Sequence, residues 1–116
     1  MLFVEYPPCS TCKKAKKWLG DHGLEYETRH IVEDKLSAQE IRGLQARSGL
    51  PVNRFFNTSG KLYREMELSK KLKTMPEPEM FELLGSNGML VKRPILVEGD
   101  TVLVGFKQAE WEAALL

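Results

Sequence analysis

The residues of this sequence with the clearest capacity for chemistry are Cys9 and Cys12, which form a C-x-x-C and are its only cysteines. The thiolate is the reactive form of cysteine, and a free thiol with a pKa of about 8.5 is only about 3% ionised at pH 7. Cys9 follows a short apolar segment and precedes a predicted helix, where unpaired backbone N–H groups favour an anion. We therefore predict that Cys9 is an activated nucleophile.

Cys12 lies one helical turn after Cys9, on the same face of the predicted helix. From there it can attack a sulfur adduct on Cys9 and close an internal disulfide, so it is the predicted resolving thiol. Four lysines follow within two turns: Lys13, Lys14, Lys16 and Lys17. They would add positive charge near Cys9, but such a run is equally typical of a solvated helix face.

Two other interpretations of the cysteine pair are weaker. A zinc site needs two more ligands, and only His22 and His30 remain, in a C-x2-C-x9-H-x7-H spacing that matches no common zinc finger. A structural disulfide would close a very small loop and constrain little of the chain. We therefore favour thiol redox chemistry, expect both histidines to be structural, and predict neither a metal nor an organic cofactor.

Charge and composition exclude several classes of function. The net charge is +1, whereas generic nucleic-acid binders usually carry a strong basic excess. The apolar run at residues 2–4 is too short for a signal peptide, and no later segment has the length of a membrane span, so the sequence predicts a cytoplasmic location. With 116 residues, 42% hydrophobic and 28% charged, the chain is expected to form one domain over residues 1–116.

The outer segments of the chain predict an α/β fold. A strand at 2–6, a helix beginning near Ser10 and a strand at 24–31 form a βαβ unit. A hairpin around Gly99-Asp100 and a helix at 107–115 form a ββα unit. The two units are expected to share one sheet.

A helical insertion is expected between these units, over about 37–84. Ser37 and Glu40 form a capping box that predicts the start of one helix, and Thr74 and Glu77 predict the start of another. Between them we expect a short helical turn and a broken helix, at 52–56 and 62–73.

Four segments, in the same order, resemble the arsenate reductase (ArsC)/Spx family. They are Pro8-Cys9-Ser10-Thr11-Cys12-Lys13-Lys14-Ala15 with Trp18-Leu19, then Phe56-Asn57-Thr58-Ser59-Gly60 with Tyr63, then Asn87-Gly88 with Leu90-Val91-Lys92-Arg93-Pro94-Ile95, and finally Val104-Gly105-Phe106-Lys107 with Trp111. The resemblance implies a thioredoxin-like fold with an inserted helical block. It also implies that Arg93 faces the thiolate of Cys9 and that Pro94 is a cis-proline beside it.

The resemblance further implies an oxyanion site. In the family's arsenate reductases, three arginines flank the cysteine. Here the first falls at Asn53 or Arg54, the second is Arg93, and Lys107 replaces the third. Ser10 and Thr11 complete the expected anion-binding residues. Lysine supplies charge but no bidentate fork, which weakens the prediction that arsenate is reduced.

Two functions therefore follow from the resemblance. The first is a thiol–disulfide oxidoreductase, arsenate reductase-like, that acts on a small oxyanion or disulfide and is regenerated by glutaredoxin, glutathione or thioredoxin. The alternative is an Spx-like redox-sensing regulator that binds the RNA polymerase α subunit, since Cys12 places the chain nearer the C-x-x-C branch of the family. Neither function involves direct contact with nucleic acid or with a membrane.

Overall fold

A four-stranded mixed sheet organises the computed structural model, which describes residues 1–116. The strand order is β2-β1-β3-β4. β1 (Leu2–Glu5) runs parallel to β2 (Glu27–His30), whereas β3 (Ile95–Glu98) is antiparallel to both β1 and β4 (Thr101–Val104). The predicted α/β arrangement, with a βαβ unit and a ββα unit in one sheet, is confirmed.

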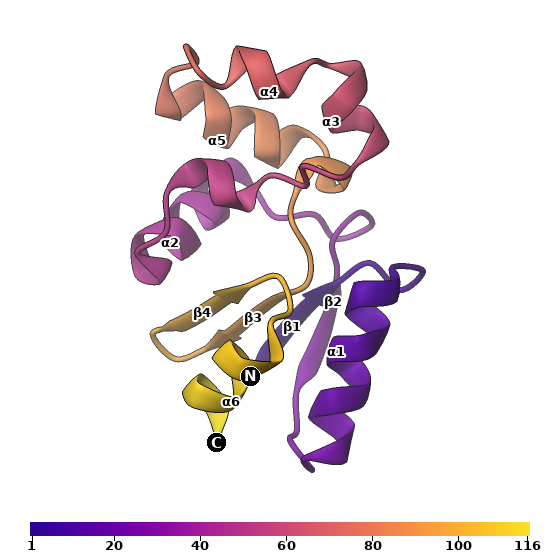
Figure 1. Ribbon diagram of the computed structural model, residues 1–116. Helices are drawn as coiled ribbons and strands as arrows, with labels where there is room; N and C mark the ends of the chain where they lie inside the picture. The colour runs from indigo at the N-terminus through magenta and orange to yellow at the C-terminus, as the bar shows by residue number, and fades with distance from the viewer.

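Two helices, α1 (Ser10–Asp21) and α6 (Gln108–Leu115), pack against one face of the sheet (Figure 1). The core between them is rich in aromatic side chains and consists of Phe3, Ala15, Trp18, Leu19, Leu96 and Trp111. The ring of Trp111 meets those of Phe3, Phe106 and Trp18 edge to face. This aromatic cluster fixes α1 and α6 relative to the strands.

The insertion between β2 and β3 is a block of short helices at one end of the molecule (Figure 1). It comprises α2 (Ala38–Ser48), η1 (Val52–Phe55), α3 (Lys61–Glu65), α4 (Leu68–Lys71), α5 (Glu77–Ser86) and η2 (Gly88–Leu90). Its apolar side chains form one core with Val4, Ile95 and Val102 of the sheet. The block therefore shares its core with the second face of the sheet.

The start of α2 follows the predicted capping box. The Ser37 hydroxyl accepts a hydrogen bond from the Glu40 backbone N–H, and the Glu40 carboxylate accepts one from the Ser37 backbone N–H, both at 3.0 Å. The same carboxylate binds Arg29 of β2 through both oxygens, at 2.7 and 3.1 Å. Glu40 thus ties the insertion to the sheet.

The second predicted capping box, Thr74 with Glu77, is wrong. The N-cap of α5 is Pro76, which makes no side-chain cap, and Pro78 occupies the first turn. A helix capped by Thr74 would begin at Met75, but Pro76 disfavours helical backbone in the residue before it. The helix therefore begins after Pro76.

The predicted strand at 24–31 is also too long. Only Glu27–His30 pairs with β1, because β1 begins at Leu2 and offers no partner to residues 24–26.

None of the helices has the length and apolar character that a membrane span requires.

One glycine fixes the return of the chain from the insertion to the sheet. Gly88 of η2 is buried against the backbone of residues 31–32, and a Cβ there would overlap the carbonyl oxygen of Ile31. This contact brings the segment that carries Arg93 close to the end of β1.

Candidate active site

Cys9 is the N-cap residue of α1 and has extended backbone angles (φ −72°, ψ 127°). Two prolines, Pro7 and Pro8, separate it from β1, so the chain leaves the sheet there and turns into the helix. Its N–H donates to the Tyr6 carbonyl at 2.9 Å. The half-buried Cys9 sulfur is therefore held at the helix start, where backbone N–H groups are free to bind it.

The surroundings of Cys9 lower the pKa of its thiol. Burial raises this pKa, but hydrogen bonds to the sulfur outweigh burial; they come from the Cys12 backbone and thiol, the Arg93 side chain and the Thr11 backbone. These donors stabilise the thiolate directly.

Two of the four lysines that follow Cys12 form ion pairs with carboxylates. Lys16 pairs with the buried carboxylate of Glu5 at 3.0 Å, and Lys17 pairs with Asp21 one turn further along α1 at 2.8 Å. The hydrogen bonds that lower the pKa of Cys9 come from backbone N–H groups, Cys12 and Arg93. For Lys16 and Lys17, the structure favours the interpretation as ion-paired residues of the helix.

Cys12 is completely buried below Cys9. Burial raises the pKa of its thiol to about 12; hydrogen bonding from the Tyr6 backbone opposes this shift, and the nearby charge of Cys9 adds to it. Cys12 therefore remains protonated at neutral pH, and hydrogen bonding from its thiol helps to lower the pKa of Cys9. The pKa of Cys9 is therefore lowered and that of Cys12 raised, although only two residues separate them.

Arg93, in the segment between η2 and β3, lines the same cavity as Cys9, and hydrogen bonding from its side chain helps to lower the pKa of the Cys9 thiol. Its guanidinium carbon lies 4.9 Å from the centre of the Tyr6 ring, and Nη1 is 3.5 Å from the Met89 carbonyl oxygen. No carboxylate forms an ion pair with Arg93, so its charge is available to a thiolate or to a bound anion. The peptide bond between Arg93 and Pro94 is cis.

A cavity of about 990 Å³ opens beside Cys9, between α1, the insertion and the start of α6. Its charged lining consists of Arg54, Lys61, Lys92, Arg93 and Lys107, with Glu65 as the single acid. Its apolar lining includes Phe56, Leu62, Met89, Val104 and Phe106. The cavity is thus suited to an organic anion.

The structure brings most of the predicted site residues to this cavity. Cys9, Thr11, Arg54, Arg93 and Lys107 all line it. Asn53, the alternative to Arg54, lines it as well. Ser10 is exposed at the start of α1 and does not line the cavity, and Cys12 lies buried behind Cys9.

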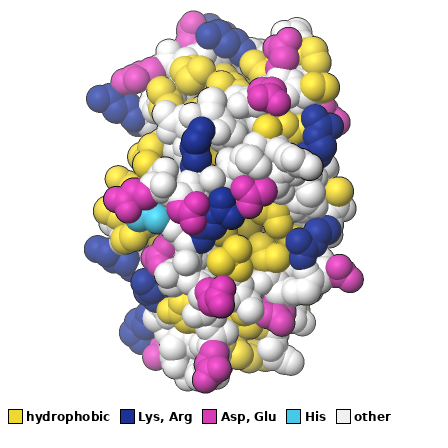
Figure 2. All heavy atoms as spheres, turned by 180° about the vertical axis from the view of Figure 1, so that it is seen from behind, with side chains coloured by type: hydrophobic (Ala, Val, Ile, Leu, Met, Phe, Trp, Pro, Cys, Tyr) yellow, Lys and Arg dark blue, Asp and Glu magenta, His cyan; other side chains and the backbone are white.

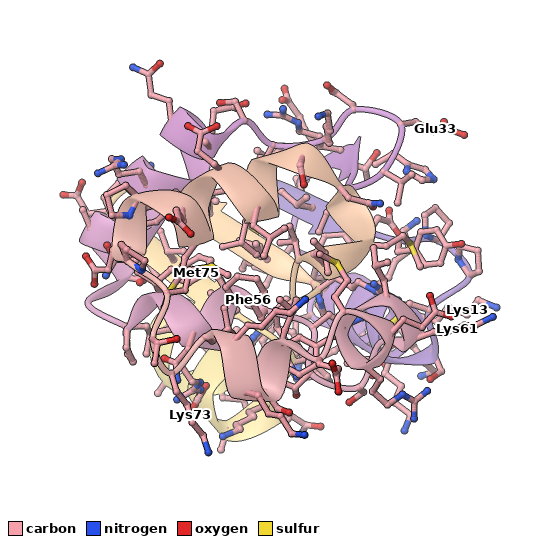
Figure 3. The ribbon with its side chains drawn as sticks, turned by 90° about the horizontal axis from the view of Figure 1, so that it is seen from above. Lys13, Glu33, Phe56, Lys61, Lys73 and Met75 are labelled. Carbon is pink, nitrogen blue, oxygen red and sulfur yellow. The ribbon has the colours of Figure 1, made fainter.

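Sequence reasoning missed Lys61, Lys92 and the turn at residues 57–60 as parts of the site. Lys92 and the turn lie in two of the segments that carry the family resemblance, but neither was assigned to the oxyanion site, and Lys61 directly follows the turn. Viewed from above, Phe56 lies inside the molecule, whereas Lys61 and Lys13 lie at the same edge (Figure 3). The positions of Lys61, Lys92 and the turn at the cavity depend on how the insertion packs, which sequence spacing does not reveal.

The two histidines are engaged in packing and hydrogen bonding. His30 Nδ1 accepts from the backbone N–H groups of Val32 and Glu33, at 3.1 and 3.0 Å. His22 packs on Trp18, with ring centres 4.4 Å apart. No group of three or more His, Cys, Asp or Glu side chains is placed to hold a metal ion.

Comparison with known proteins identifies the family. The ArsC family model matches residues 4–114. YusI of Bacillus subtilis is 50% identical over 112 residues, which cover 97% of this chain and 95% of YusI. The global transcriptional regulator Spx of Listeria monocytogenes is 29% identical over 104 residues, covering 90% of this chain and 78% of Spx. A crystal structure of an ArsC family related protein from Bacteroides fragilis has a TM-score of 0.94 and 54% identity, covering 97% of this chain and 94% of that one. This chain therefore belongs to the ArsC family and has its thioredoxin-like fold.

Proposed function

We propose that this protein is a thiol–disulfide oxidoreductase in which Cys9 is the nucleophile and Cys12 the resolving thiol. The observation that carries the proposal is the contrast between the two thiols. Cys9 has a lowered pKa and faces the cavity, whereas Cys12 has a raised pKa and is buried below it. One thiol is suited to attack the substrate and the other to wait until the adduct has formed.

The proposed reaction oxidises the two thiols by two electrons. The Cys9 thiolate attacks one sulfur of a disulfide R–S–S–R′, forms a Cys9–S–R bond and releases R′–S⁻, which takes up a proton. Cys12 then loses its proton and attacks the Cys9 sulfur, which breaks the Cys9–S–R bond and releases R–S⁻. An external thiol reductant such as glutaredoxin, glutathione or thioredoxin reduces the resulting Cys9–Cys12 disulfide by the same type of exchange.

The cavity favours an organic disulfide with anionic groups over a small oxyanion. Its volume of about 990 Å³ lies near the upper end of the range of about 300–1,000 Å³ that holds drug-sized organic ligands. Five cationic side chains against one acid favour carboxylates on the ligand. The apolar wall around Phe56 and Phe106 would contact its carbon skeleton.

Arsenate is the weaker candidate substrate because Lys107 stands where the family's arsenate reductases have an arginine. Losing one bidentate partner costs roughly 1.5–3 kcal/mol, the range for charged hydrogen bonds, and therefore about ten- to a hundredfold in binding. We expect slow arsenate turnover that rises in Lys107→Arg. If both proteins are inert with glutathione–glutaredoxin and with thioredoxin, arsenate is not a substrate.

The test of the proposed function is a disulfide-exchange assay with a dicarboxylate aromatic disulfide such as 5,5′-dithiobis(2-nitrobenzoate). The native protein should release two thiolates per molecule and end with an internal Cys9–Cys12 disulfide. Cys12→Ser should release one thiolate and keep the other half of the reagent on Cys9, while Cys9→Ser should be inert at neutral pH. Equal reactivity of Cys9→Ser and the native protein would show that Cys9 is not the nucleophile.

A second candidate function is a redox switch that binds the RNA polymerase α subunit. The likeness to Spx over 90% of this chain supports it, together with the internal cysteine pair. Affinity capture of the purified α subunit by the native protein and by Cys9→Ser, under oxidising and reducing conditions, tests this candidate. Binding that depends on oxidation in the native protein alone, without catalytic turnover of any disulfide, would favour the switch over the enzyme.

A further inference from the structure

Tyr6 lies next to Cys9, Cys12 and Arg93 of the candidate site. Its carbonyl accepts the Cys9 N–H at 2.9 Å, hydrogen bonding from its backbone acts to lower the pKa of Cys12, and its ring lies 4.9 Å from the guanidinium carbon of Arg93. The two backbone contacts are independent of the side chain. The ring contact with Arg93 is therefore the part of this arrangement that depends on residue type.

Arg93 has few other restraints. No carboxylate forms an ion pair with it, and its hydrogen bond to the Met89 carbonyl is long, at 3.5 Å. An aromatic face attracts a guanidinium within about 6 Å of the ring centre, and this attraction grows when the pair is shielded from water. Both Tyr6 and Arg93 are half-buried, which strengthens the contact between them.

The Tyr6 ring also contacts an aromatic side chain of the sheet. His30 of β2 meets it at 89° with ring centres 5.9 Å apart. His30 is itself fixed because its Nδ1 accepts two backbone N–H groups from the loop after β2. A continuous series of contacts therefore runs from the sheet through His30 and Tyr6 to Arg93.

We propose that the ring of Tyr6 is a positioning group that holds the Arg93 guanidinium against the Cys9 sulfur. Tyr6 is not among the residues that line the cavity, and its ring contacts the lining residue Arg93, so it acts through Arg93. The proposal rests on the proposed function in one respect, namely that Cys9 reacts as a thiolate. It extends that function by assigning a role to a residue outside the four motifs that carry the family resemblance.

The experiment is a thiolate titration at 240 nm on the native protein, Tyr6→Phe and Tyr6→Leu, each also made with Arg93→Met. Because the pKa of Cys12 is raised to about 12, the signal below pH 9 belongs to Cys9. Tyr6→Phe keeps the ring and should titrate like the native protein. Tyr6→Leu should lower the thiolate-to-thiol ratio at a fixed pH roughly two- to fivefold, and should have no further effect when Arg93 is already Met.

Controls separate positioning from a general loss of packing. Tyr26→Leu removes another half-buried tyrosine, which packs on Phe3 away from the cavity, and should leave the titration unchanged. His30 and the cavity's charged residues, Arg54, Lys61, Glu65, Lys92 and Lys107, are the same in every variant. Circular dichroism checks folding, and Tyr6→Met replaces Tyr6→Leu if the latter unfolds.

Three results would overturn the proposal. The first is a native-like titration in Tyr6→Leu, and the second is an equal loss in Tyr6→Phe, which would implicate the hydroxyl. The third is an undiminished effect of Tyr6→Leu in the Arg93→Met background. A native Cys9 that titrates like a free thiol would instead contradict the proposed function itself, so the two failures are distinguishable.

Discussion

Cys9 and Cys12 are expected to differ in reactivity, because hydrogen bonding at a helix start lowers the pKa of one thiol and burial raises the pKa of the other. Iodoacetamide at pH 7.5 should therefore modify Cys9 and leave Cys12 unmodified in the folded protein. Peptide mass spectrometry after a timed quench measures this, with the protein unfolded in urea as a control in which both react. Comparable labelling of Cys12 in the folded state would contradict the assignment of roles.

Two neighbouring lysines of α1 should differ in their effect on stability. Lys16 neutralises Glu5, whose side chain is only 6% exposed, so Lys16→Met leaves a buried carboxylate unpaired and should cost about 1–3 kcal/mol. Lys17 pairs with the exposed Asp21, so Lys17→Met is the matched control and should cause no measurable change. Urea unfolding of the two variants compares them, and equal costs would show that burial of Glu5 is not decisive.

At the scale of elements, Glu40 joins the start of α2 to β2, and this link should depend on pH. Hydrogen bonds from Arg29 and then from the Ser37 N–H lower the pKa of Glu40 to about 2. A lowered carboxyl pKa contributes stability above the ordinary value of about 4.5, and this contribution is lost as the pH falls towards 2. Because Glu40 is 45% exposed, solvent screening reduces the contribution to about 1–2 kcal/mol.

Glu40→Gln isolates the charge, because glutamine can still complete the capping box. The variant should be less stable than the native protein at pH 7, and the difference should shrink as the pH falls from 4.5 to 3. Urea unfolding across this range measures the difference. A gap that is independent of pH would show that Glu40 acts through its shape or capping rather than through its charge.

The junction between the insertion and the sheet should tolerate no side chain at Gly88. A Cβ there overlaps the backbone of Ile31, so Gly88→Ala should destabilise by about 1–3 kcal/mol or more. Gly43 lies in the exposed interior of α2 with open space around it, so Gly43→Ala should stabilise by about 0.5–1 kcal/mol. Thermal unfolding distinguishes the two, and an unchanged melting temperature in Gly88→Ala would mean that the junction can relax.

Considered as a whole, the molecule carries a net charge of +1, yet five cationic side chains line the one cavity beside Cys9. On the face shown in Figure 2, by contrast, acidic and basic side chains are interspersed. Negatively charged iodoacetate should therefore react with Cys9 faster, relative to neutral iodoacetamide, than it does with a free thiol. Added salt should reduce this ratio, and a ratio that does not respond to salt would show that the cavity exerts no such attraction.

Local signals predicted much of this molecule, and packing between distant segments decided the rest. The position of Cys9 at a helix start and the capping box at Ser37 could be predicted because both depend on residues within one turn. The start of α5 could not be predicted from Thr74 and Glu77, since Pro76 restricted the backbone between them. The cavity residues Lys61 and Lys92, like the contact of Tyr6 with Arg93, depend on how the insertion folds back onto the sheet.

The aromatic cluster beneath the cavity gives the protein an intrinsic optical signal. Phe106 lines the cavity, and its ring centre lies 4.9 Å from that of Trp111. The Trp111 indole N–H donates to the carbonyl of Gly105, another lining residue, at 3.0 Å. Trp18, the only other tryptophan, belongs to the same helix as Cys12. Occupation of the cavity should therefore change tryptophan fluorescence, so that binding and turnover can be followed in unlabelled protein.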